Sequence, residues 1–106
     1  MIDNKEKIKH IADTYGYDAQ SRQCIEEMAE LTQAINKFWR KDLKCGKLTT
    51  LEVPSGSPQE LSIIEEIADV QIMLWQMAYL LNADVTPIIE QKLDRQLERI
   101  EKCTNS

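Results

Sequence analysis

The sequence predicts an all-α fold, an antiparallel bundle of about four helices that forms a single domain over residues 1–106. Only three glycines and three prolines occur in 106 residues, which argues against a sheet with many tight turns. Apolar residues recur at three- and four-residue steps, and most connections between these stretches are short. A chain of this length has room for one modest hydrophobic core.

The first half of the chain predicts two helices. Asp3 and Glu6 form an N-terminal capping pair for a short helix that ends near residues 15–16. Asp18 can cap a second, longer helix that runs to about residue 44. Its apolar stripe consists of Cys24, Met28, Leu31, Ala34, Ile35 and Phe38.

The second half predicts two further helices after an irregular connection over residues 45–56. The run Ser57-Pro58-Gln59-Glu60 combines an N-cap serine, a proline at the first helical position and a glutamate at the third, and the helix should extend to about Asn82. Thr86-Pro87 marks the start of the fourth helix.

Between residues 72 and 81 of the third predicted helix, apolar side chains point in nearly every direction. A small monomer has little surface with which to cover them, so we expect a homo-oligomer, a dimer in the simplest case, that buries Trp75, Met77 or Tyr79. Gln76 interrupts this stretch, which is also too short to span a bilayer. We therefore expect a soluble protein that does not bind membranes.

The composition of the chain limits the cellular environment and the classes of partner that we expect for it. A net charge of −5 disfavours a general nucleic-acid-binding protein, because such binding depends on clustered lysines and arginines. Cys24, Cys45 and Cys103 are odd in number and lack CxxC spacing, so neither a disulfide framework nor a thiolate zinc site is expected. The polar N-terminus does not resemble a signal peptide. A reducing, cytoplasmic location fits these features best.

One acidic pattern occurs twice. The segments 26–31 (EEMAEL) and 65–70 (EEIADV) align position for position at an offset of 39 residues. At about 100° per residue, Glu27 and Glu30 fall on the apolar side of the second helix, and Glu66 and Asp69 on that of the third. The sequence therefore predicts two inward-facing carboxylate pairs on two helices that can pack together.

Four carboxylates facing one another need a compensating cation. Two like charges about 4 Å apart repel by roughly 4 kcal/mol at a surface-like dielectric. Magnesium, or manganese as the alternative, prefers such oxygen ligands, whereas the single histidine, His10, lies on another helix and disfavours zinc. Glutamates at this spacing also occur as solvated helix faces, which is the competing interpretation.

At these residues the chain resembles the MazG-like, all-α nucleoside triphosphate pyrophosphohydrolases, whose signature is EExxE followed on a later helix by ExxD. Here the signature reads Glu26-Glu27-Met28-Ala29-Glu30 and then Glu66-Ile67-Ala68-Asp69. The resemblance covers roughly residues 20–99. The 35 residues between Glu30 and Glu66 exceed the separation in many family members, and residues 45–56 account for the difference.

The resemblance implies a hydrolase that binds magnesium and cleaves a nucleoside triphosphate (NTP or dNTP) to a nucleoside monophosphate and pyrophosphate. It implies that Glu27, Glu30, Glu66 and Asp69 are the metal ligands and the catalytic groups. Glu26 and Glu65 lie about 100° away on their helices, so we expect them to be outer or surface groups.

Further residues are candidates for binding the substrate. Gln20 and Gln23 lie on the carboxylate stripe, where an amide can read a base edge or hydrogen-bond a ligand carboxylate. Lys41 lies about four turns beyond Glu27 on the same side of the helix. The last predicted helix carries a basic stripe that consists of Lys92, Arg95 and Arg99. This stripe resembles the family's phosphate-contacting residues, and the alternative is that it forms a solvated helix face.

Two other functions remain as alternatives. A phosphoribosyl-ATP pyrophosphohydrolase cleaves a related bond with similar carboxylates. A non-catalytic helical oligomerisation module would use the same glutamates as solvated or ion-paired groups and would not depend on metal.

Overall fold

The computed structural model describes residues 3–43 and 56–105, with the side chains of all of these except residues 42, 43 and 105. This part of the chain is helical nearly throughout and contains no strand: α1 spans Asn4–Phe38, the π-helical turn η1 spans Trp39–Leu43, α2 spans Pro58–Leu80 and α3 spans Thr86–Asn105. The all-α prediction is confirmed. The predicted connection at residues 45–56 lies outside the described residues except for Gly56.

Helix α1 contains both of the helices predicted in the first half of the chain. The Asp3 side chain accepts a hydrogen bond of 2.8 Å from the Glu6 backbone N–H, as the capping pair predicts. Gly16 interrupts the helix with φ 83° and ψ 171°, a backbone conformation that residues with a Cβ rarely adopt. Helix α1 therefore bends at Gly16, close to the predicted boundary, and its two segments differ in direction.

The predicted start of α2 is confirmed in detail. Ser57 Oγ accepts a 3.0 Å hydrogen bond from the Glu60 N–H, Pro58 occupies the first helical position, and Glu60 Oε2 accepts one from the Gly56 N–H. Helix α2 ends at Leu80 with Asn82 at φ 51°, and the Ala83 N–H donates to the Ala78 carbonyl oxygen. These bonds satisfy backbone groups that a helix end leaves without partners.

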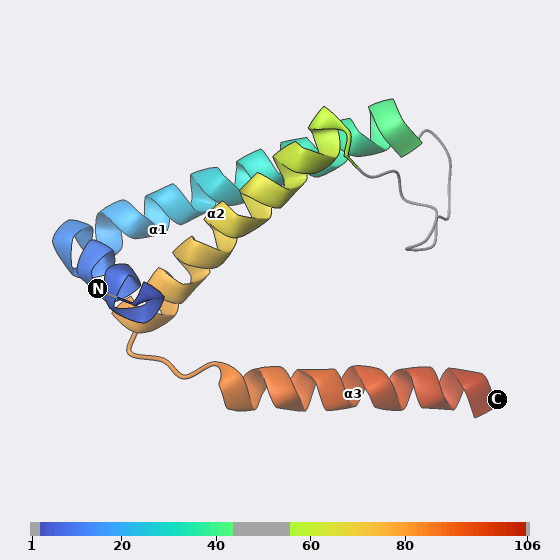
Figure 1. Cartoon of the computed structure of the whole chain (residues 1–106). Helices are drawn as coiled ribbons and strands as arrows, with labels where there is room; N and C mark the ends of the chain where they lie inside the picture. The colour runs from blue at the N-terminus through green and yellow to red at the C-terminus, as the bar shows by residue number, and fades with distance from the viewer. Residues whose placement is uncertain (1–2, 44–55, 106) are drawn as a thin grey trace.

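Helices α1 and α2 lie side by side as an antiparallel hairpin (Figure 1). Its core is small and contains five apolar residues and two glutamines: Ala12, Gln20, Cys24, Phe38, Val70, Met73 and Gln76. Gln20 Nε2 donates to Gln76 Oε1 at 2.7 Å, which satisfies two buried amides between the helices. None of the described helices has a segment long and apolar enough to cross a membrane.

Helix α3 follows the hairpin after residues 81–85 but does not pack along it (Figure 1). All of its described side chains are exposed, including Ile89, Leu93, Leu97 and Ile100. The radius of gyration is 17.5 Å, whereas a compact domain of this length has a value of about 13 Å. The described helices of a single chain therefore do not close into the predicted bundle.

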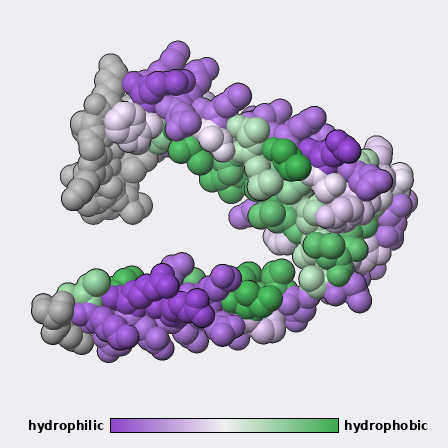
Figure 2. All heavy atoms as spheres, turned by 180° about the vertical axis from the view of Figure 1, so that it is seen from behind, coloured by the Kyte–Doolittle hydropathy of each residue, from purple (hydrophilic) through white to green (hydrophobic). Residues whose placement is uncertain are grey.

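Apolar side chains also remain exposed on α2. Ile64, Ile67, Leu74 and Trp75 are between 41% and 54% exposed. Figure 2 shows apolar surface on the side of the hairpin that faces the hollow between it and α3. Of the residues that the sequence offered for a dimer interface, Trp75 is exposed, whereas Met77 and Tyr79 are already half-buried within the chain.

Candidate metal centre

The hairpin brings together carboxylates from both copies of the acidic pattern. One carboxylate oxygen from each of Glu27, Glu66 and Asp69 lies within 4.8 Å of the others. Glu27 is on α1 and the other two residues are on α2, so the cluster forms only when the helices pack. Glu66 and Asp69 are three residues apart, which places them on the same face of their helix.

Glu30 belongs to the same electrostatic cluster. The neighbouring Glu27 carboxylate, followed by desolvation, raises the pKa of Glu30 above its usual value, and Asp69 adds to the effect. Burial raises the pKa of Glu66, with further contributions from Glu30, Asp69 and Glu27. Every charged group that shifts these two pKa values is another carboxylate, so the cluster favours the uptake of a proton or a cation.

Two oxygens of the cluster are sheltered from solvent. Glu27 Oε2 and Glu66 Oε2 are buried and have no hydrogen-bond partner in the described part of the chain. A buried carboxylate oxygen without a partner is costly, and a divalent cation with oxygen ligands would satisfy both. The donor set, carboxylate oxygens alone, fits magnesium or manganese better than zinc.

The two glutamines on the carboxylate stripe have different partners. Gln23 Nε2 donates to Glu27 Oε1 at 2.8 Å, so this amide orients one carboxylate of the cluster. The Gln20 amide is buried and bonded to Gln76 Oε1, away from solvent. Gln76, which is 2% exposed, was not among the predicted site residues. A lone polar residue within an apolar stretch was the available signal for a buried hydrogen bond.

The basic candidates do not join the cluster within one chain. Lys92, Arg95 and Arg99 are exposed on α3, which stands apart from the hairpin (Figure 1). Lys41 is exposed in η1, near the end of the hairpin at which Phe38 is buried. The structure thus brings together three of the four predicted carboxylates, Glu27, Glu66 and Asp69, and leaves the predicted phosphate-binding cations at a distance. Glu30 and Asp69 are exposed, so the two pairs do not both face inward as predicted.

No family model matches this chain, and comparisons with curated proteins and with solved structures give no match. The site is therefore interpreted from its own geometry and from the motif that it carries.

Proposed function

We propose that this protein is a magnesium-dependent nucleoside triphosphate pyrophosphohydrolase of the MazG-like kind. The observation that carries the proposal is the convergence of Glu27, Glu66 and Asp69 from two helices, with two sheltered oxygens that lack partners. Carboxylates that raise one another's pKa values are a common arrangement for holding divalent cations. The spacing of the residues also follows the family signature, EExxE and ExxD.

In this proposal Glu27, Glu30, Glu66 and Asp69 hold the metal. When bound, magnesium supplies positive charge for the triphosphate and lowers the pKa of water. Gln23 keeps Glu27 in one orientation through its 2.8 Å hydrogen bond. Neighbouring carboxylates raise the pKa of Glu30, so any proton that Glu30 carries would be displaced when magnesium binds. Water adds across the anhydride bond between the α- and β-phosphates, which yields a nucleoside monophosphate and pyrophosphate.

The test is pyrophosphate release from a panel of NTPs and dNTPs with magnesium. Glu27→Gln and Glu66→Gln should each lower the rate by about a hundredfold, because each removes a ligand charge. Glu65→Gln is the matched control, since Glu65 precedes Glu66, is exposed and should leave the rate unchanged. No release from any nucleotide would sink the proposal. Activity that survives both substitutions would contradict the metal assignment but not the enzyme class.

Two alternatives share part of this evidence. Phosphoribosyl-ATP belongs in the same panel, because a related pyrophosphohydrolase would use the same carboxylates on it. The exposed apolar faces of α2 and α3 favour a non-catalytic oligomerisation module as the second candidate. Such a module predicts that magnesium leaves the melting temperature unchanged, whereas a metal site predicts a rise with magnesium concentration.

The proposal includes a homo-oligomer in which α3 of one chain covers the exposed apolar face of α2 in another. The apolar stripe of α3 and the exposed residues Ile64, Ile67 and Leu74 of α2 are both without cover in one chain. Such an exchange would bring the partner's basic helix toward the acidic cluster and give α2 a second helix to pack against, with the cations near enough to bind phosphate.

Mixing two inactive variants tests this arrangement. Glu66→Gln lacks a metal ligand, and the double variant Arg95→Ala/Arg99→Ala lacks phosphate contacts. If α3 acts on a partner's site, mixed oligomers contain one intact site and recover part of the wild-type activity. The test requires a wild-type enzyme that is active and dimeric. If the mixture of variants is then as inactive as each variant alone, α3 does not act in another chain. A monomeric wild-type protein at micromolar concentration would refute the oligomer.

A further inference from the structure

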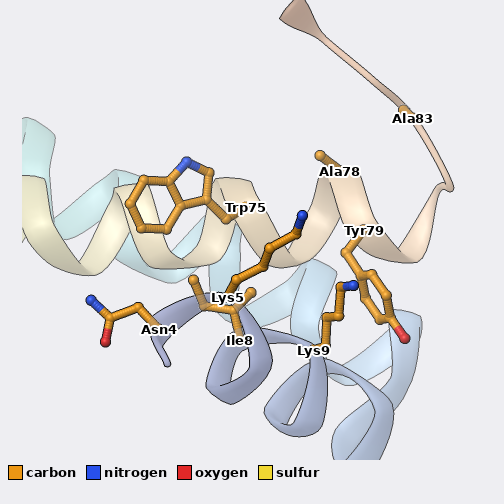
Figure 3. A pocket seen from close by; sticks show the side chains of 8 residues that line it. All are labelled: Asn4, Lys5, Ile8, Lys9, Trp75, Ala78, Tyr79 and Ala83. Carbon is orange, nitrogen blue, oxygen red and sulfur yellow. The ribbon is translucent and has the colours of Figure 1, made fainter. Parts of the chain in front are cut away.

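A cavity of about 480 Å³ lies at the other end of the hairpin from the start of α2. It is formed between the first two turns of α1 and the last turns of α2, with Ala83 at its edge (Figure 3). Its size falls within the range of pockets that bind small molecules. Its apolar lining residues include Ile8, Trp75 and Ala78, and its charged ones are Lys5 and Lys9.

The walls of this cavity are held in place by hydrogen bonds between the two helices. The Tyr79 hydroxyl donates to the Asp13 carboxylate, with distances of 2.9 and 2.8 Å to its two oxygens. The buried Gln20–Gln76 bond lies directly beyond this contact, toward the middle of the hairpin. The bend at Gly16 directs the N-terminal segment of α1 across α2 at this level. The cavity is therefore largely pre-formed.

Its chemistry combines an open aromatic surface with positive charge. Trp75 is 54% exposed. Lys5 and Lys9 are four residues apart on one face of α1 and reach toward α2 between Trp75 and Tyr79 (Figure 3). The Lys9 Nζ lies 5.9 Å from the centre of the Tyr79 ring. The hydrogen bond to Asp13 raises the pKa of Tyr79, and the neutral phenol offers its ring as a cation–π surface.

Two cations at an apolar cavity, in a protein of net charge −5, select for an anion with an apolar body. We propose that this cavity is a second binding site that takes a planar aromatic ring carrying a phosphate, as in a nucleoside monophosphate. The ring stacks on Trp75, and the phosphate accepts hydrogen bonds from Lys5 and Lys9.

This site is separate from the carboxylate cluster. Trp75 follows Glu66 by nine residues, which corresponds to about 14 Å along α2 and to a rotation of about 180° around its axis. A ligand stacked on Trp75 therefore lies on the opposite side of α2 from the metal ligands. The inference does not depend on the proposed hydrolysis, because binding here needs neither magnesium nor turnover.

The test uses Trp75 fluorescence in a Trp39→Phe background, so that one tryptophan reports. Adenosine monophosphate, added without magnesium, should quench this fluorescence saturably, while adenosine and ribose 5-phosphate bind about tenfold more weakly or worse. The double variant Lys5→Ala/Lys9→Ala should bind adenosine monophosphate about tenfold more weakly than the parent protein, or more weakly still. Lys7→Ala is the matched control, because Lys7 is exposed on α1 and does not line the cavity. Glu66→Gln should leave the binding unchanged.

Three results would overturn the proposal. The first is the absence of saturable quenching at millimolar adenosine monophosphate. The second is equal weakening by Lys7→Ala, which would indicate general attraction to the surface. The third is self-association that covers Trp75. Sedimentation would then show an oligomer, and the Trp75 fluorescence would depend on protein concentration and not on nucleotide. The variant Trp75→Leu should lose the binding of adenosine monophosphate, as measured by calorimetry. Its helix content should be unchanged, which shows that the variant is folded.

Discussion

The α1–α2 hairpin and α3 are equally helical, yet they differ in what they bury. The hairpin encloses Val70 and Met73 and joins its helices through the Gln20–Gln76 bond. Helix α3 has an apolar stripe of its own, but every described side chain on it is exposed, Leu97 by 62%. Caps and residue spacing therefore predict where a helix begins and which face is apolar, whereas burial of that face requires a second surface.

The largest difference between the two regions should appear on truncation of a core residue. Met73→Ala removes a side chain that is 6% exposed in the hairpin, and it should lower the free energy of unfolding by about 2–5 kcal/mol. Urea denaturation followed by circular dichroism measures this. A loss below about 1 kcal/mol would mean that the hairpin is not the stable unit of the chain.

The second largest loss of stability should follow from breaking the buried amide pair. Gln76→Leu leaves the Gln20 amide buried without its partner and should cost about 1–3 kcal/mol. The double variant Gln20→Leu/Gln76→Leu should recover much of that loss, because no polar group then stays unsatisfied. If the double variant is as unstable as the sum of the single ones, the two amides do not act as a pair.

A smaller, reversible effect should follow from the carboxylate cluster. In the metal-free protein the pKa values of Glu30 and Glu66 lie above the usual 4.5, so folding favours their protonated forms. Their contribution to stability is complete below pH 4.5 and is lost as pH rises through the raised values. The melting temperature should therefore fall over this window. Magnesium at neutral pH should restore it, and Glu66→Gln should flatten the pH dependence.

The smallest effect is expected in α3. Leu97→Ala should change the free energy of unfolding by less than about 0.5 kcal/mol in dilute protein, because Leu97 is exposed and alanine favours helix. At high concentration the same variant should weaken self-association, as measured by sedimentation. A large loss of stability in dilute monomer would show that α3 packs on its own hairpin.

Much of the fold follows from local signals. Asp3 with Glu6, and Ser57-Pro58 with Glu60, form the predicted caps, and Gly16 marks the predicted interruption. The carboxylates of Glu27, Glu66 and Asp69 meet as their spacing predicts, because residues on the inner faces of two paired helices share one layer. The Asp13–Tyr79 and Gln20–Gln76 bonds were not predicted, since their partners are 66 and 56 residues apart in the chain.

The sequence by itself determined which residues are helical, where the caps lie and which faces are apolar, because each depends on neighbours within about one turn. Tertiary structure decided the register of α1 against α2. That register brings Glu27 to Glu66 and Asp69 and shelters two carboxylate oxygens, and it forms the cavity beside Trp75. It also decided that α3, despite its amphipathic pattern, stays uncovered in a single chain, since a pattern specifies a face to bury but not the surface that buries it.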